Sequence, residues 1–454
     1  MRKTIVLYLL AVLLSVGTNA QKLVDLSPNP KNIEWFNKDR FGIFVHFGLY
    51  SILGGSYEGT ILTPDIDTTK FLHSRTWYAE WIQMKLNIPR KDYQNLAKSF
   101  NPVNFNADEW IREVKNAGAK YFIITAKHHD GFALWNSKVS DFNIMHTPFK
   151  RDILAELVAA CKKYGIKYGF YYSHWQDWED PNGAVPYDFI EKRSSEAFEK
   201  YWQGKCLPQV KELIQKFDPD LLWFDTWGTE GQHITPKRRD ELIALVRANS
   251  KKCLINGRIA YANPGENVDF LEMGDNEFPK EKIGKAWETS GTMQNSWGWH
   301  AYDFNWKPAK EFIANLIGNA SKGGNYALNI GPKPDGTFPA PAIARLREIG
   351  AWNFTNGESV FGASPVSLTL SEKDVYLTQK SIDGINYVYI NIIKPLDKIT
   401  IPADIATFKD CVVLETGMPV KLVADGTGTL IVFPKSLFKD CSPVTLKLRT
   451  TDKL

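Results

Sequence analysis

Between about residue 40 and residue 350, the sequence alternates short apolar runs with amphipathic helical segments. This alternation is typical of βα units, which assemble a parallel sheet. Eight strands are predicted, at residues 41–49, 121–127, 166–172, 221–225, 253–258, 268–273, 286–289 and 326–330. Eight parallel strands within about 300 residues favour an α/β fold, a (β/α)8 TIM-like barrel.

Helices are predicted between these strands wherever apolar residues recur at helical spacing. Asp152 at the start of one helix and Gly165 at its end are good capping residues. The predicted helices cover residues 107–117, 152–164, 194–217, 237–250 and 308–321.

The pattern changes after Gly357 to short runs of alternating apolar and polar residues, which predict a small antiparallel β-sandwich. The expected domains are therefore a barrel over residues 21–357 and a sandwich over residues 358–454. Because the sandwich carries no catalytic constellation, a stabilising accessory role is favoured over a carbohydrate-binding module.

The first twenty residues have the character of a secretory signal. Arg2 and Lys3 precede an apolar run over residues 5–16, and Thr18-Asn19-Ala20 resembles a cleavage site. The run is too short to cross a bilayer, and no later segment is long and apolar enough, so no membrane insertion is expected. We expect an exported protein, either periplasmic or secreted.

Charge and cysteine content narrow the possible partners. The chain has 55 basic and 51 acidic residues without a long basic run after the signal, which argues against nucleic acid. Five scattered cysteines form neither a disulfide framework nor a metal motif, although Cys411 and Cys441 could pair.

The 15 tryptophans can fill the core or stack on sugar rings.

Polar residues follow two of the predicted strands, where a barrel enzyme carries its active site. The segments are Ala126-Lys127-His128-His129-Asp130-Gly131-Phe132 and Pro219-Asp220-Leu221-Leu222-Trp223-Phe224-Asp225. Side chains alternate along a strand, so Leu221, Trp223 and Asp225 share one face, which we expect to be the interior. Asp225 could be the nucleophile of a glycosidase beside an aromatic platform, or it could cap the next helix.

Three histidines follow strands in the same way. His128 and His129 are adjacent and have no His-x-His or His-x-x-x-His spacing, so a metal site is not predicted. They suit neutral donors to sugar hydroxyls, and His46 occupies a similar position, although a lone histidine there can also be a core group. Tyr171 and Arg258 could belong to the site, or be a core tyrosine and an ordinary ion pair.

Acid/base catalysis needs a second carboxyl group. Glu288 stands in Ala286-Trp287-Glu288-Thr289, at the expected end of a strand, where burial beside tryptophan would raise its pKa. We therefore predict Glu288 as the acid/base. Four nearby residues compete with it: Glu266, Glu272, Glu277 and Glu281.

Taken in order, ten short motifs resemble those of glycoside hydrolase family 29, the α-L-fucosidases. The resemblance covers residues 30 to 360, and so many motifs in one order are highly specific. The motifs are FGIFVHFGLYS (41–51), AEW (79–81), KHHDGF (127–132), GFYYS (169–173), WFD (223–225), INGR (255–258), WE (287–288), SWG (296–298), SKGGNYALNIGP (321–332) and DG (335–336).

The resemblance implies a barrel with a C-terminal β-sandwich and an exo-acting, retaining α-L-fucosidase that cleaves fucosylated glycans without metal or cofactor. Asp225 matches the family nucleophile. The residues at positions resembling the fucose-binding set are His46, Glu80, Trp81, His128, His129, Tyr171, Trp223 and Arg258.

Two alternatives remain at this point. One is a catalytically silent, lectin-like fucose-binding protein, and the other is an exo-glycosidase for a galactose-like sugar. The glycan linkage and the oligomeric state have no signal in the sequence.

Overall fold

In the computed structural model of the chain, eight parallel strands form one sheet in the order β7-β6-β5-β4-β1-β10-β9-β8. A parallel bridge between Asn256 and Phe270 joins the ends of this order, so the sheet closes on itself. The predicted barrel is therefore confirmed. Its strands are β1 Phe41–Val45, β4 Tyr121–Lys127, β5 Lys167–Tyr172, β6 Leu221–Phe224, β7 Leu254–Ile255, β8 Leu271–Glu272, β9 Trp287–Thr292 and β10 Asn325–Ile330.

The structure describes residues 24–63, 77–185, 193–226, 233–260, 264–368, 370–426, 428–438 and 442–451. The predicted signal segment and Cys441 lie outside these residues, so the possible pairing with Cys411 does too. The other four cysteines are buried, and no disulfide joins any two of them.

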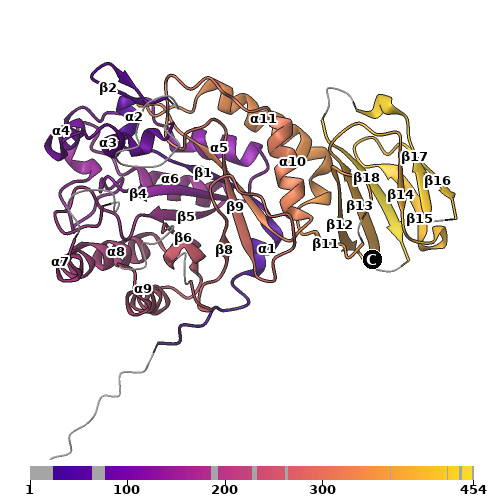
Figure 1. Cartoon of the computed structure of the whole chain (residues 1–454), viewed down its shortest axis with the longest axis horizontal. Helices are drawn as coiled ribbons and strands as arrows, with labels where there is room; N and C mark the ends of the chain where they lie inside the picture. Colours follow the sequence, from indigo (N-terminus) through magenta and orange to yellow (C-terminus); the bar gives the residue numbers. More distant parts are fainter. Residues whose placement is uncertain are drawn as a thin grey trace, which may run out of the picture.

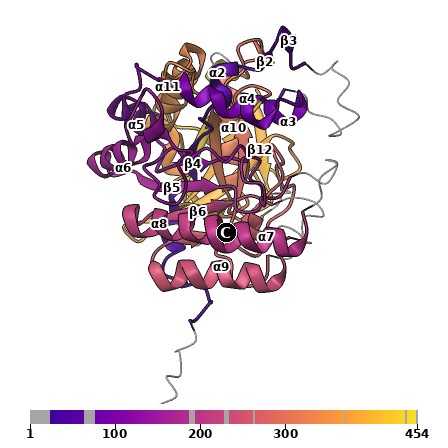
Figure 2. The same cartoon turned by 90° about the vertical axis from the view of Figure 1, so that its left-hand side faces the viewer.

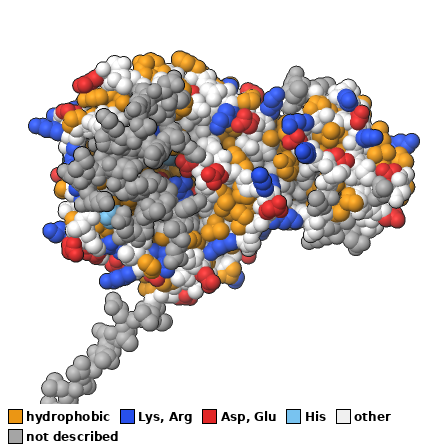
Figure 3. Space-filling view, in the orientation of Figure 1, with side chains coloured by type: hydrophobic (Ala, Val, Ile, Leu, Met, Phe, Trp, Pro, Cys, Tyr) orange, Lys and Arg blue, Asp and Glu red, His pale blue; other side chains and the backbone are white. Residues whose placement is uncertain are grey.

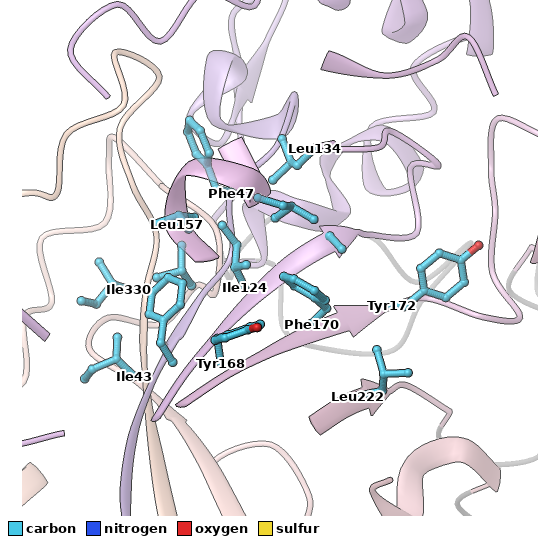
Figure 4. Packing of buried hydrophobic residues seen from close by; sticks show 14 of the residues in the cluster. Ile43, Phe47, Ile124, Leu134, Leu157, Tyr168, Phe170, Tyr172, Leu222 and Ile330 are labelled. Carbon is cyan, nitrogen blue, oxygen red and sulfur yellow. The ribbon is translucent and has the colours of Figure 1, made fainter. Parts of the chain in front are cut away.

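Alternation along the strands divides the core into two layers. Leu221 and Trp223 belong to a cluster inside the barrel, whereas Leu222 and Phe224 pack outside it against the helices. This confirms the predicted faces of β6. Figure 4 shows the outer layer, where Ile124 of β4, Phe170 of β5 and Leu222 of β6 come from neighbouring strands.

Helices surround the strands (Figure 2). The Asp152 carboxylate accepts a hydrogen bond from the Ala155 amide at the start of α6, and Gly165 ends that helix with a φ of 66°. The predicted helix at 194–217 consists of α7, a π-helical stretch (Trp202–Cys206) and α8, and the unpredicted α11 follows β10. The helices are α1 Glu34–Asp39, α5 Ala107–Asn116, α6 Ile153–Tyr164, α7 Ser195–Tyr201, α8 Leu207–Phe217, α9 Pro236–Asn249, α10 Ala309–Ala320 and α11 Ala340–Asn356.

Two connections depart from a regular βα repeat. The long one between β1 and β4 contains α2 (Tyr50–Leu53), the hairpin strands β2 (Ser56–Tyr57) and β3 (Thr60–Ile61), a 3-10 helix (Ala79–Trp81), α3 (Ile82–Lys85) and α4 (Arg90–Asn95). Between β7 and β9, where β8 lies, the only helix within the described residues is the 3-10 helix Gly257–Ala260. Arg258 therefore lies in this short helix rather than in the predicted strand 253–258.

The C-terminal part consists of antiparallel strands with their own hydrophobic cluster, and it lies beside α10 and α11 (Figure 1). The strand order is β11-β12-β13-β18-β15 in one sheet and β14-β17-β16 in the other. The Trp352 indole of α11 donates a hydrogen bond to the Pro443 carbonyl, at 2.9 Å. The strands are β11 Ser364–Pro365, β12 Val375–Ile382, β13 Ile385–Ile392, β14 Lys398–Ile401, β15 Phe408–Val413, β16 Lys421–Ala424, β17 Thr429–Val432 and β18 Val444–Thr450.

Basic and acidic side chains are interspersed over the face drawn in Figure 3. This agrees with the near balance of charges in the sequence. Within the described ranges, no helix combines the length and apolar character that crossing a membrane requires.

Candidate active site

Asp225 directly follows β6 at the carboxyl end of the barrel strands, and its side chain is largely buried. The Tyr171 hydroxyl donates a hydrogen bond to Oδ2 at 2.7 Å, and Nη2 of Arg258 lies 2.6 Å from Oδ1. His129 Nε2 is 3.6 Å from Oδ2, and the Trp175 indole donates to the Asp225 carbonyl at 2.8 Å. Neighbouring strands thus fix the carboxylate from several sides.

The protonation of Asp225 reflects two opposing effects. Burial raises its pKa above the ordinary value, while the Arg258 charge and the Tyr171 hydrogen bond oppose this rise. The same ion pair raises the pKa of Arg258, so the guanidinium stays charged. A carboxylate with an adjacent cation and a hydrogen-bond donor is suited to act as a nucleophile.

Three imidazoles line the space next to Asp225. The rings of His46 and His128 are 5.6 Å apart, and burial lowers the pKa of both, for His46 to about 4. His46 Nδ1 lies 2.7 Å from Asn329 Oδ1, and His129 Nδ1 lies 2.6 Å from Ser173 Oγ. Burial also lowers the pKa of His129. This favours the neutral form of all three imidazoles, which can exchange hydrogen bonds with hydroxyls.

The adjacent rings of His128 and His129 lie 4.3 Å apart, because the chain leaves β4 at Lys127 and no longer alternates like a strand. Across the part of the chain that the structure describes, no group of three or more His, Cys, Asp or Glu could hold a metal ion.

Glu80 lies in the 3-10 helix before α3 and is almost fully buried. Its Oε2 accepts hydrogen bonds from the Gly298 amide at 2.8 Å and the Ser296 hydroxyl at 3.4 Å. Oε1 has no hydrogen-bond partner among the described residues. Burial raises the pKa of Glu80 to about 7. A carboxyl group with one unused oxygen among polar side chains is suited to binding a sugar hydroxyl.

The two predicted tryptophans have different surroundings. Trp223 is only 3% exposed; it stacks on Tyr171 at 5.4 Å between ring centroids, and the Arg258 guanidinium lies 5.1 Å from its ring. Trp81 is half-buried and meets the His129 ring edge-on at 4.9 Å. Trp81 therefore offers more open surface to a sugar, and Trp223 mainly supports the partners of Asp225.

Asp275 is a second carboxylate at this site, and sequence reasoning missed it. Nη1 of Arg258 donates to its Oδ1 at 2.9 Å, while the Tyr78 hydroxyl donates to its Oδ2 at 3.3 Å. One guanidinium thus bridges Asp225 and Asp275. The Asp275 side chain is 25% exposed. It lies just after the predicted strand 268–273, so the rule that identified Asp225 also points to it, but the glutamates nearby obscured that signal.

The prediction that Glu288 lies at the end of a strand is wrong. β9 continues to Thr292, so Glu288 is its second residue and lies near the opposite end of the barrel from Asp225. Its side chain is fully buried and accepts a hydrogen bond from the hydroxyl of Tyr121, the first residue of β4. The structure therefore gives no support to Glu288 as an acid/base that could reach substrate.

The competing glutamates also stand apart from Asp225. Glu272 is buried opposite Glu288 in the barrel, and the other three are exposed: Glu266, Glu277 and Glu281. By contrast, the structure brings the remaining predicted site residues together in one cluster: His46, Glu80, Trp81, His128, His129, Tyr171, Trp223, Asp225 and Arg258.

Comparisons with known proteins agree with the fold. The sequence model described as "Alpha-L-fucosidase" matches residues 18–358. The chain is 28% identical over 441 residues to the α-L-fucosidase of Dictyostelium discoideum, covering 92% of each chain. It resembles the crystal structure of α-L-fucosidase from Vibrio sp. strain EJY3 with a TM-score of 0.83 and 30% identity, over 95% of this chain and 74% of that one.

A third similar structure captures a reaction intermediate. It is the trapped covalent intermediate of a family 29 α-L-fucosidase from Bacteroides thetaiotaomicron with 2-fluoro-fucosyl fluoride. The TM-score is 0.81 at 26% identity, over 94% of this chain and 97% of that chain. With the family match over three quarters of the sequence and the same architecture, this chain belongs to the α-L-fucosidase family, glycoside hydrolase family 29.

Proposed function

We propose that the chain is an exo-acting, retaining α-L-fucosidase in which Asp225 is the nucleophile. The observation that carries this proposal is the Asp225 carboxylate, held by Tyr171 and Arg258 at the carboxyl end of the barrel strands. The covalent intermediate trapped in the Bacteroides thetaiotaomicron relative supports a mechanism in two displacements.

In the first displacement, a carboxylate oxygen of Asp225 attacks the anomeric carbon and the bond to the aglycone oxygen breaks, with a proton delivered to that oxygen. In the second, water attacks the same carbon, gives up a proton and releases the sugar from Asp225. Each displacement inverts the anomeric carbon, so the product keeps the configuration of the substrate.

Asp275 is our proposed acid/base. It binds the same guanidinium as Asp225, an arrangement compatible with the separation of roughly 5–5.5 Å between the carboxyl groups of retaining glycosidases. Its partial exposure suits a group that meets the aglycone on the solvent side. Proton donation requires Asp275 to be protonated, so we expect its contact with Arg258 to be released when substrate enters.

The burial of the site favours a terminal sugar. Glu80, His129 and Asp225 are each 7% exposed or less, as expected of residues that enclose a single sugar unit. A silent, lectin-like protein is not favoured, because the nucleophile candidate retains both of its partners. A galactose-like substrate would be revealed by a panel of aryl glycosides.

The test is hydrolysis of aryl α-L-fucoside by wild type, Asp225→Gly, Asp275→Gly and the control Glu281→Gln, which changes an exposed carboxylate. Both glycine variants should lose activity, and azide should restore it with opposite stereochemistry. Azide replaces the nucleophile in Asp225→Gly and gives the inverted fucosyl azide. In Asp275→Gly it attacks the covalent intermediate and gives the retained product. An inverted product from Asp275→Gly would contradict the assignment.

We also propose that the protein is exported and that residues 1–20 are removed, on the strength of Arg2, Lys3 and the apolar run that follows. Mass spectrometry of protein produced with its full leader in a bacterial host should find a mature N-terminus near Gln21. An intact leader on protein that stays in the cytoplasm would contradict this.

A further inference from the structure

Beneath the proposed active site, two glutamates lie side by side inside the barrel. Glu272 of β8 and Glu288 of β9 are register partners in neighbouring parallel strands. Their exposed fractions are 4% and 0%. Neither is hydrogen-bonded to Asp225 within the described residues, and the catalytic cycle proposed above gives them no role.

The hydrogen bonds of this pair are incomplete. Oε1 of Glu272 accepts from the Ser290 amide at 3.1 Å and the Ser290 hydroxyl at 2.8 Å. Glu288 Oε2 accepts from the Tyr121 hydroxyl. Three buried atoms have no hydrogen-bond partner within the described residues: Glu272 Oε2, Glu288 Oε1 and the indole nitrogen of Trp223. Both glutamates thus have one oxygen left over.

Two ionised carboxylates would be very costly in this position, because burial and mutual repulsion both oppose the second charge. Burial is the largest effect that raises the pKa of each glutamate, and the Glu288 charge raises the pKa of Glu272 further. Besides each other, the ionisable groups that influence them are Tyr121 and Arg258. A proton between the two leftover oxygens removes the repulsion and satisfies both atoms.

We propose that Glu272 and Glu288 share one proton and together act as a positioning pair for Trp223. Tyr121, whose hydroxyl bonds Glu288, packs with Trp223 in one cluster inside the barrel. The indole N–H of Trp223 makes no hydrogen bond within the described residues, so it is available to the adjacent glutamate pair, and it lowers the pKa of Glu288. The indole in turn supports Tyr171, stacked at 5.4 Å, and Arg258, at 5.1 Å. These are the two side chains that hold the proposed nucleophile, so the pair acts on it through Trp223. This catalytic consequence rests on the proposed function.

Infrared spectroscopy tests the shared proton without relying on activity. At pH 8.5, wild type should show the carbonyl band of a protonated, buried carboxyl group. The band should be absent from Glu272→Gln and from Glu288→Gln, because in each variant the introduced amide N–H replaces the shared proton. It should persist in the control Glu80→Gln. Two results would overturn the proposal. One is the absence of the band from wild type, as expected for two carboxylates around a bound cation. The other is a band that survives in either single variant.

Kinetics test the positioning role. The amide of either single variant can still make the hydrogen bond between the two side chains, so kcat should stay within about threefold of wild type. The double Gln variant loses the charge that orients Trp223, and kcat should fall about 10- to 100-fold with little change in KM. The concentration of active sites is counted by trapping with 2-fluoro-fucosyl fluoride, and kcat is calculated per trapped site. A variant that merely contains less folded protein then keeps the same kcat. An unchanged kcat in the double variant overturns the positioning role.

Discussion

Glu80 should make the stability of this protein depend on pH, and Glu80→Gln should remove that dependence. Burial raises the pKa of Glu80 from an ordinary 4.5 to about 7 in the folded protein. Between these values the folded state binds more protons than the unfolded state, so the free energy of unfolding falls as pH rises. The folded and unfolded pKa values differ by roughly 2.5, and each unit corresponds to about 1.36 kcal/mol. The free energy of unfolding should therefore fall by about 3 kcal/mol between pH 4.5 and pH 7.5.

The glutamine in Glu80→Gln cannot ionise, and its side-chain oxygen can still accept from the Gly298 amide, as Glu80 Oε2 does. Relative to wild type, the variant should therefore gain about 3 kcal/mol of unfolding free energy between pH 4.5 and pH 7.5. An upper limit of pH 7.5 keeps Lys85 mainly charged, since burial lowers its pKa to about 8.

Urea unfolding followed by tryptophan fluorescence at pH 4.5, 6.0 and 7.5 measures this difference. The matched control is Glu281→Gln, an exposed position, which should stay within about 0.5 kcal/mol of wild type at every pH. A constant offset between Glu80→Gln and wild type across the series would refute the reasoning, because it would mean that Glu80 keeps one protonation state throughout.

Three further substitutions test the contacts around the nucleophile. Tyr171→Phe removes the hydrogen bond that lowers the pKa of Asp225, so the acidic limb of kcat/KM should move to higher pH. Tyr172→Phe, whose hydroxyl donates to a glutamine outside the site, should leave that limb in place, and equal shifts would contradict the assignment. Arg258→Lys cannot reproduce two directed carboxylate contacts and should lower kcat/KM on aryl α-L-fucoside about 100-fold or more; a loss under threefold would count against its role. Trp81→Ala should raise KM more than it lowers kcat, because a stacking surface binds substrate and transition state alike; a change confined to kcat in steady-state assays would argue otherwise.

The barrel could be predicted because its strands are short, apolar and separated by good helix signals. β4 has the predicted bounds, 121–127. Asp225 could be found for a related reason, because alternation along β6 places it on the face of Trp223.

Glu288 shows where sequence reasoning fails. A polar residue in an apolar run marks the end of a strand only if the strand ends there, and β9 continues through Thr289, Ser290 and Gly291 to Thr292. Polar side chains are tolerated in this strand because they find partners inside the barrel, as the Ser290 hydroxyl does on Glu272. Such pairing depends on register between distant segments, which one sequence does not display.

Asp275 was missed for a related reason. Its significance comes from Arg258, which lies in a short helix and binds two carboxylates at once. Neither the short helix nor the shared contact produces a periodic pattern in the sequence. Several nearby glutamates, by contrast, have the residue type expected of an acid/base and drew the assignment away from Asp275.

The most direct test of the central claim is to trap the covalent intermediate and find the residue that carries it. The wild-type protein would be incubated with 2-fluoro-fucosyl fluoride, weighed intact by mass spectrometry and then digested for peptide mapping. We predict one added 2-fluoro-fucosyl group per chain, on the carboxylate of Asp225, and no adduct in Asp225→Gly. An active enzyme that forms no adduct, or forms it on another residue, would contradict the account.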